Sequence, residues 1–433
     1  MKSRGTAESL RLFQRALKIF AGGVNHNARY QLPYPISIER AKGSRIWDVD
    51  GNEYTDYWIG HMALILGHSP KPVVEALAAQ IANGTHFGAA NPLSLELGEL
   101  VCRTVPCAEM LRFCNSGAEA TMYLVRLARG FTKKRVVVKI SGGWHGYNTE
   151  LNKAVRAPFD RTEGAGIVPS EQEFTKPAKF NDIEAAERAV RSAKGDVAAI
   201  FLEPVLGAGG CIPATRDYLK GLRELCDRTG CLLAFDEVIT GFRLALGGAQ
   251  EAYRVRPDIA ALGKVVGGGL PIGVVCGEKE VMSLADPRGK KTAVSIGGGT
   301  FSENPLSMTA GIATLKYLMK HEEELYRRLD RMGESIRKGV DRAMVEQGMT
   351  ARTTGKGSLF FTHFGSAPMN AEEAARGDGA LEAAYAQGMM KRGIYVLPGH
   401  LSGVSAAHSE REVKAFLTKS GEVARTLKPH RKM

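Results

Sequence analysis

Short apolar runs alternate with amphipathic helical patterns through the middle of the chain. Residues 197–205 (VAAIFLEPV) and 231–238 (CLLAFDEV) have the length and composition of buried strands. Residues 181–194 and 216–230 have helical periodicity, and a further apolar run follows at 257–264. This alternation predicts an α/β fold with a mostly parallel sheet covered on both faces by helices. Ligands of such sheets bind at the carboxyl ends of the strands, so the residues that follow each run are candidates for function.

The two ends of the chain have a different character. Residues 35–58 hold two strand-like pieces around a turn, and residues 306–348 are mostly helical. Two more strand-like pieces and a last helix at about 409–427 follow. We therefore expect a large central domain and a smaller α+β domain built from both termini. The predicted boundaries give residues 1–72 and 310–433 to the smaller domain and residues 73–309 to the larger one.

Charge and cysteine usage narrow the classes of function. The net charge of +12 is compatible with a nucleic-acid partner, but the basic residues are spread along the 433 residues. The one dense basic cluster is the tail at 428–433, which we expect to be a solvated end. The seven cysteines are scattered and form no CxxC pair, which predicts buried free thiols, no metal site and a cytoplasmic location. No run approaches the roughly 18 consecutive apolar residues of a membrane span.

The first twenty residues are basic and amphipathic. Leu10, Phe13, Leu17 and Phe20 recur at helical spacing. A transit peptide has a similar composition, but such peptides are poor in acidic residues and Glu8 is present here. We therefore expect a first helix that docks on the folded protein.

A helix is predicted to begin at Ser116-Gly117, directly after a strand-like piece. A helix start offers unpaired backbone N–H groups and the positive end of the dipole, which together bind phosphate. Gly117 permits close approach, and the Ser116 hydroxyl can donate a hydrogen bond. The alternative is that Ser116 only caps the helix and that Glu119 completes a capping box.

Two carboxylates are predicted at the ends of buried strands. Asp236 follows four apolar residues, and Glu203 ends the preceding strand. A buried carboxylate is costly unless it is paired, so Asp236 needs a partner. A protonated heterocyclic nitrogen of a ligand would serve, and a structural ion pair to Arg243 is the alternative.

Two glycine-rich loops add further candidates. Trp144 and His145 lie between glycines, where an aromatic face can stack on a planar ligand. The alternatives are ordinary packing for Trp144 and a structural role for His145. Thr300 follows three glycines and is a second candidate for phosphate binding, with a flexible loop as its alternative.

Lys264 lies between an apolar run and a cluster of glycines. Lysine is rarely fully buried unless it is paired, so a solvated loop is the alternative to a functional amine. The candidates together supply an amine, a buried acid, a stacking ring and two phosphate-binding turns. Pyridoxal phosphate needs these groups: the amine for a Schiff base, the acid to keep the ring nitrogen protonated, and donors for the phosphate.

With these motifs in order, the sequence resembles the class III aminotransferases of fold type I. The resemblance is carried by NSGAEA, GGWHGYN, LEPV, FDEVITGFR, ALGKVVGGGLPIG and GGTFSENPLSMTAG, and it runs from about residue 20 to 425. The segments GGVNHNAR, DVDGNEYTDYW and LGHSP are similar to the glutamate-1-semialdehyde aminomutase branch. Some aminotransferases that act on β-amino acids share this pattern.

The resemblance implies a role for each candidate in the cofactor site. Lys264 carries pyridoxal phosphate and shuttles the proton, and Asp236 pairs with the ring nitrogen. Val238 and Trp144 cover the two faces of the ring, although family members usually have Tyr or Phe at the second position. The remaining cofactor-binding residues are Ser116, Gly117 and Ala118 at the phosphate, Thr300 from a neighbouring subunit, and His145 and Glu203 near the ring. The contribution of Thr300 implies a homodimer with shared active sites.

The substrate side rests on the same resemblance. Arg29 matches a position that can hold a substrate carboxylate in the aminomutase branch, and a surface arginine is the alternative. Trp58, His61 and Met62 are expected to line the substrate pocket.

One departure from the aminomutase branch favours one of two reactions. The aminomutase branch has a Phe-Glu-Ala-Gly stretch shortly before its AHS motif, whereas this chain reads LPGHLSGVSAAHS and lacks the glutamate. The sequence therefore predicts an aminotransferase that moves an amino group from a small-molecule donor to an oxo acid. An isomerase, either an aminomutase or a racemase, is the alternative. A nucleic-acid-binding protein on the same fold is disfavoured, because no clustered basic face with aromatics is visible.

Overall fold

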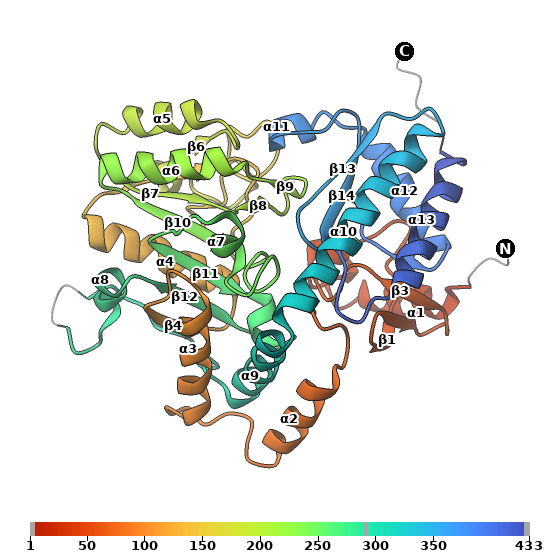
Figure 1. Cartoon of the computed structure of the whole chain (residues 1–433), viewed down its shortest axis with the longest axis horizontal. Coiled ribbons are helices and arrows are strands. Elements are labelled where there is room, and N and C mark those ends of the chain that lie inside the picture. The colour runs from red at the N-terminus through yellow and green to blue at the C-terminus, as the bar shows by residue number, and fades with distance from the viewer. Residues whose placement is uncertain (1–4, 290–292, 428–433) are drawn as a thin grey trace. The chain divides into compact units, whose positions relative to one another are not determined.

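The computed structural model describes residues 5–289 and 293–427, so the basic tail lies outside the described residues. The chain divides into two compact units, which Figure 1 shows with their elements labelled. The larger unit comprises Lys71–Arg327 and Pro368–Arg376, and the smaller unit comprises Met1–Pro70, Arg328–Ala367 and Gly377–Met433.

A seven-stranded sheet forms the core of the larger unit. Its order is β4 (Met110–Cys114), β12 (Gly273–Gly277), β11 (Ile259–Gly263), β10 (Leu232–Glu237), β7 (Val197–Leu202), β5 (Val136–Ile140) and β6 (Thr175–Ala178). The neighbours from β11 to β6 are parallel, and β12 runs antiparallel to both β11 and β4. The predicted mostly parallel sheet is confirmed. A small hairpin of β8 (Val205–Leu206) and β9 (Ile212–Pro213) follows β7.

Helices pack along this sheet because each presents an apolar stripe to it. α4 (Gly117–Thr132) packs against β11 and β12, with Leu124, Val125 and Leu127 fully buried. Figure 1 shows α5 (Ile183–Ser192) and α6 (Arg216–Thr229) side by side along β6 and β7. The other helices of this unit are α2 (Lys71–Ile81), α3 (Pro92–Thr104), α7 (Gly248–Tyr253), α8 (Lys279–Met282), α9 (Pro305–Lys320) and α11 (Ala371–Ala374), with short 3₁₀ turns at Pro169–Gln172, Lys264–Gly267 and Ser283–Ala285.

The smaller unit combines two sheets with helices from both ends of the chain. The first sheet has the order β1 (Ile38–Lys42), β2 (Arg45–Asp48), β3 (Glu53–Asp56) and β15 (Ile394–Tyr395). The second consists of β13 (Ala351–Thr354), β14 (Leu359–Phe364) and β16 (Ser402–Gly403). The helices are α1 (Ala7–Ala16), α12 (Gly379–Lys391) and α13 (Glu410–Ala424), and 3₁₀ turns lie at Ala21–Gly23 and Asn27–Arg29. α10 (Glu322–Val345) begins in the larger unit and continues into this one.

The division between the units differs from the predicted domain boundaries of 1–72, 73–309 and 310–433. The structure divides after Pro70 and after Arg327, and Pro368–Arg376 returns to the larger unit. The predicted boundary at residue 309 falls inside α9. That helix belongs to the larger unit because it packs on α2 and α3.

The first helix is held by polar contacts and by one residue of its apolar stripe, Phe13, whose ring stacks on that of Tyr34 with centroids 6.5 Å apart. Asp50 accepts hydrogen bonds from the backbone N–H groups of Glu8 and Ser9, at 2.7 and 3.0 Å, and from the Ser9 hydroxyl at 2.7 Å. Leu17 and Phe20 of the predicted stripe are exposed. The predicted docking occurs, and a carboxylate that caps the helix start contributes to it together with the Phe13–Tyr34 contact.

Two chain-wide properties complete the fold. All seven cysteines are free, and all except Cys102 are buried. Among the described residues, no helix is long and apolar enough to cross a membrane.

Candidate active site

The register of the large sheet brings the predicted site residues to one edge. In the parallel pairs, Phe235 lies opposite Leu202, and Asp236 lies opposite Ala261. Glu203 and Lys264 therefore emerge from the carboxyl ends of the strands that flank β10. This is the edge at which parallel sheets bind ligands.

Lys264 is the first residue after β11, and its backbone has a φ of +50°. This conformation is uncommon for a residue other than glycine and is typical of constrained functional sites. Val265 and Val266 beside it are fully buried, whereas Lys264 keeps part of its surface exposed. Among the described residues, its amine has no hydrogen bond or ion pair.

Burial lowers the pKa of Lys264 below the ordinary value for lysine. The negative charges of Asp236 and Glu203 oppose this shift, and the positive charge of Arg243 adds to it. A lowered pKa increases the fraction of neutral amine, which is the form that acts as a nucleophile or base.

Asp236 is buried and has two partners from the surrounding loops. Its Oδ2 lies 2.8 Å from His145 Nδ1, and its Oδ1 accepts a hydrogen bond of 3.0 Å from the Val238 N–H. The structure therefore gives Asp236 an ion-pair partner in His145, a residue that the sequence analysis did not pair with it. His145 is also buried, which lowers its pKa, while Asp236 acts in the opposite direction.

Glu203 fixes the loop that carries Trp144. Its two carboxylate oxygens accept hydrogen bonds from the backbone N–H groups of Trp144, at 2.8 Å, and Gly207, at 2.9 Å. Burial and the negative charge of Asp236 raise the pKa of Glu203 to about 8. The Trp144 ring is half-buried and meets Tyr147 edge-on at 4.9 Å. Glu203 thus acts on the candidate stacking residue through its backbone.

The start of α4 has the capping box that the sequence analysis gave as the alternative to phosphate binding by Ser116. The Ser116 hydroxyl accepts a hydrogen bond from the Glu119 N–H at 3.2 Å, and the Glu119 carboxylate accepts one from the Ser116 N–H at 3.1 Å. These bonds leave the N–H groups of Gly117 and Ala118, at the first two helical positions, without an intrahelical acceptor. The structure therefore keeps both interpretations of Ser116 open.

Val238 connects the helix start with the lysine strand. A Cβ atom at Gly117 would lie 2.7 Å from Val238 Cγ2, and one at Gly263 would lie 3.2 Å from Val238 Cγ1. Only glycine fits at position 117 because Val238 occupies the space. The predicted ring-contacting residue and the predicted phosphate turn are therefore neighbours.

The segment before Thr300 also approaches the start of α4. The Asn115 side chain donates a hydrogen bond of 3.3 Å to Gly298 O, and Tyr123 OH accepts one of 3.0 Å from the Gly298 N–H. Thr300 itself is exposed. Its predicted contribution to the site of a neighbouring subunit stays a prediction.

The predicted substrate residues lie in the smaller unit. Arg29 is exposed at the end of a 3₁₀ turn. Trp58 is half-buried, and its ring lies 4.4 Å from that of His61 and 5.3 Å from that of His400. Met62 is fully buried and has no surface to offer a substrate, contrary to expectation.

Sequence reasoning did not identify two buried groups of the larger unit, Lys139 and Glu237, and it named Arg243 only as an alternative partner of Asp236. Lys139 lies within β5, and Arg243 follows β10; both are almost fully buried. Glu237, beside Asp236, accepts hydrogen bonds from the Thr240 hydroxyl and the Ala249 N–H, and burial raises its pKa to about 7. A charged residue inside an apolar run was the available signal for Lys139 and Glu237.

Comparison with known proteins agrees with this geometry. The pattern that defines the aminotransferase class-III family matches residues 26–407. The chain belongs to this family. The glutamate-1-semialdehyde 2,1-aminomutase of Thermodesulfovibrio yellowstonii is 39% identical over 418 residues, which cover 94% of this chain and 96% of that protein.

Two solved structures of transaminases share the whole fold. An omega-transaminase from Sphaerobacter thermophilus superposes with a TM-score of 0.91 and 32% identity, covering 97% of this chain and 98% of that one. A transaminase with PLP bound has a TM-score of 0.90 and 31% identity, with 98% of both chains covered. The predicted fold type I architecture is confirmed for this class III chain.

Proposed function

We propose that the protein is a pyridoxal-phosphate-dependent enzyme that moves an amino group between carbon atoms. The observation that carries the proposal is an unpartnered amine, Lys264, at the strand edge that also presents the buried Asp236–His145 pair. Pyridoxal phosphate supplies a reactive aldehyde and a ring that accepts electrons from a substrate carbon. The similarity to a transaminase with PLP bound supports the same cofactor here.

The residues present fit this cofactor. Asp236 offers a buried carboxylate for the ring nitrogen, and His145 holds that carboxylate in place. We assign Val238 and Trp144 to the two faces of the ring, and the position of Val238 beside Gly117 supports this assignment. The N–H groups at the start of α4, with the Ser116 hydroxyl, offer donors for the phosphate.

Lys264 is the residue that we assign to proton transfer. Its amine has a lowered pKa and no competing partner, so in neutral form it can remove and return a proton at the substrate carbon. Asp236 stabilises positive charge nearby, and Glu203 holds the Trp144 loop. Arg29, Trp58 and His61 remain our candidates for contact with the substrate.

Two forms of the reaction are candidates, and the curated relatives favour the first. In an aminomutase, the amino group moves within one substrate, as the name of the Thermodesulfovibrio yellowstonii relative states. This form agrees better with the comparisons than the aminotransferase predicted from the sequence.

The second candidate is transfer from an amino donor to an oxo-acid acceptor. It is favoured by the segment at 398–408, which contains no acidic residue where the aminomutase branch has a glutamate. The similarity to an omega-transaminase supports it as well.

One assay separates the two forms. The protein saturated with pyridoxal phosphate is given glutamate-1-semialdehyde alone, and in parallel an amino acid with and without a 2-oxo acid. Conversion of the semialdehyde without an acceptor supports the aminomutase, and turnover that requires the oxo acid supports the aminotransferase. Absence of visible cofactor absorbance and of both activities overturns the proposal.

We also propose a cytoplasmic homodimer in which Thr300 reaches the cofactor phosphate of the partner. The buried free thiols favour a reducing compartment. Sedimentation should give twice the chain mass, and Thr300→Ala should weaken cofactor binding without dissociating the dimer. A monomer with full cofactor affinity contradicts this proposal.

A further inference from the structure

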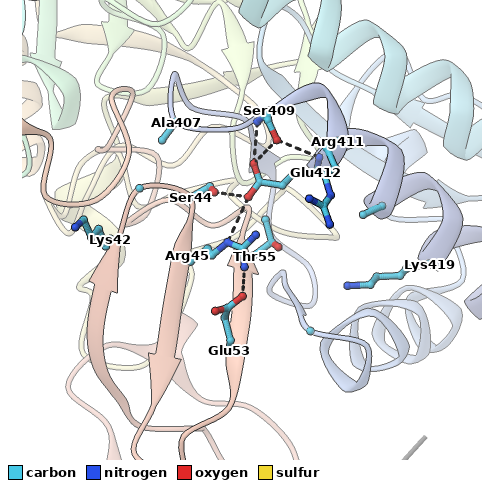
Figure 2. Close-up of a pocket in the computed structure, with 13 residues that line it drawn as sticks. Lys42, Ser44, Arg45, Glu53, Thr55, Ala407, Ser409, Arg411, Glu412 and Lys419 are labelled. Carbon is cyan, nitrogen blue, oxygen red and sulfur yellow. Dashed lines mark hydrogen bonds and ion pairs between the residues drawn. The ribbon is translucent and has the colours of Figure 1, made fainter.

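The smaller unit has a pocket that the proposed reaction does not use. It has a volume of about 700 Å³ and is lined by residues of β1, β2, β3 and α13. Figure 2 shows Lys42 on the strand side, Arg411 and Lys419 on the helix side, and Glu412 between them. All of the lining residues belong to the smaller unit.

The two carboxylates of the pocket are already engaged. Glu412 accepts hydrogen bonds from the Ser44 hydroxyl at 2.5 Å and from the Ser409 N–H at 2.8 Å, and its Oε1 lies 3.7 Å from Arg45 Nε. Glu53 forms an ion pair with Arg45. Although burial acts to raise the pKa of Glu412, these hydrogen bonds outweigh it and lower the pKa. Both acids therefore contribute fixed negative charge that is directed at protein donors.

The cations of the pocket outnumber these acids. Lys42, Arg45, Arg411 and Lys419 supply four positive charges against two negative ones, which leaves an excess of two. Lys42 and Arg411 are exposed and have no ion pair within 4.0 Å among the described residues. Positive charge that converges on a concave surface concentrates anions there.

The remaining lining is small and polar. Glycine, serine, threonine and alanine form the rest of the wall, and no aromatic or large aliphatic side chain is present. Recognition here must therefore come from charge and hydrogen bonds rather than from stacking. A nucleic-acid strand needs a basic groove with aromatic platforms, which this pocket does not provide.

We propose that this pocket binds a compact polyanion, a small soluble molecule that carries two or more phosphate groups. Lys42 and Arg411 hold the ligand from opposite walls, with Arg45 and Lys419 completing the positive surface. The pocket is a second ligand site, separate in sequence from the residues assigned to the cofactor. Because its cations are partly exposed, the affinity should fall as salt rises.

Isothermal titration calorimetry with tripolyphosphate tests the proposal. The full chain is first saturated with pyridoxal phosphate, so that the cofactor phosphate site is filled. We expect saturable binding that is weakened at least ten-fold in the double variant Lys42→Ala/Arg411→Ala. The double variant Lys391→Ala/Lys414→Ala is the matched control, since it removes two exposed cations of the same unit that do not line the pocket. It should change the affinity less than two-fold.

Three results would overturn the proposal. One is the absence of saturable heat with the native protein, and another is equal weakening in the two double variants. The third is sedimentation with phosphatidic acid vesicles that tripolyphosphate does not displace, since this would assign the phosphate groups to a lipid surface. The Lys264→Ala variant should bind tripolyphosphate normally, so failure of the proposed enzymatic function leaves this test intact.

Discussion

The larger unit contains two lysines in buried surroundings, and their differences show what makes an amine available for chemistry. Lys139 lies within β5 and has no exposed surface, and its Nζ lies 3.4 Å from both Ile140 O and Ala154 O. Lys264 lies one residue beyond β11, keeps part of its surface exposed, and has no partner among the described residues. The two lysines therefore differ in their position along a strand, one inside it and one just beyond its end.

Burial lowers the pKa of both amines, but the charges that oppose the shift differ between the two lysines. The pKa of Lys139 falls to about 7, with the charges of Glu203 and Glu163 opposing the shift. The pKa of Lys264 is also lowered, and there the opposing charges are Asp236 and Glu203. A lowered pKa alone therefore does not mark the functional lysine. Partial exposure of the residue and a nitrogen without a hydrogen-bond or ion-pair partner among the described residues distinguish Lys264.

The largest expected effect comes from replacing each of the two lysines in turn. Lys264→Ala should abolish the visible absorbance of the bound cofactor and reduce kcat by about 10³-fold or more, because nucleophile and base are lost together. Lys139→Met should keep the absorbance and lose at most about ten-fold. Absorbance spectra and steady-state kinetics of both variants provide the measurement. Cofactor colour that disappears with Lys139 and survives without Lys264 would break the comparison.

The second effect tests the charge of Asp236, which raises the pKa of Lys264 and is not among the charges acting on Lys139. Asp236→Asn removes an anion that raises the pKa of Lys264, so that pKa should fall further. We expect kcat/KM to fall by about 10²-fold, because stabilisation of positive charge in the site is lost.

Trace acetylation of the cofactor-free protein, read by mass spectrometry, reports both amines in one sample. Lys264 should become reactive at lower pH in the variant. Lys139 is the internal control and should stay unlabelled in both proteins, because it has no exposed surface. Comparable labelling of the two lysines in the native protein is the result that contradicts this prediction.

The strand-end residues could be predicted from the sequence, because apolar runs fix where strands end. Asp236 and Lys264 follow such runs, and the register places them on adjacent strands. The partner of Asp236 could not be predicted, since His145 reaches it from a loop that is 91 residues away in sequence. A local pattern carries no information about such contacts across the sheet.

Burial was harder to predict than secondary structure. The periodicity at residues 1–20 predicted an apolar docking face, yet Leu17 is exposed, and a carboxylate helps Phe13 to hold the helix. Lys139 interrupts an apolar run and was passed over, although its side chain is fully buried. What covers a residue depends on elements distant in sequence, and hydrophobic spacing alone does not specify them.

A third prediction concerns the pH dependence of stability that Lys139 contributes. Its pKa is 10.5 in the unfolded chain and about 7 in the folded protein, so between these values the unfolded chain binds the additional proton. Stability therefore rises with pH in this range, by up to about 1.4 kcal/mol per pH unit. Relative to Lys139→Met, the native protein should gain up to about 4 kcal/mol between pH 7 and 10.5.

Urea unfolding at a series of pH values measures this gain. The matched control is Lys220→Met in α6, an exposed lysine whose replacement should leave a difference that does not vary with pH. A constant difference for Lys139→Met would show that Lys139 has the same pKa in both states and would contradict its burial.

The smallest effect comes from a neighbour that acts on Lys139 and is not among the charges acting on Lys264. Glu163 accepts hydrogen bonds from the backbone N–H groups of Val155 and Arg156, each at 2.8 Å, and its charge raises the pKa of Lys139. Glu163→Gln keeps an acceptor oxygen but removes the charge, so the pKa of Lys139 should fall by less than about one unit. Stability at neutral pH should then decrease by less than about 1.4 kcal/mol, with kcat unchanged. If kcat instead falls while the pH dependence of stability stays the same, the two lysines are coupled more closely than their separate positions in the sheet imply.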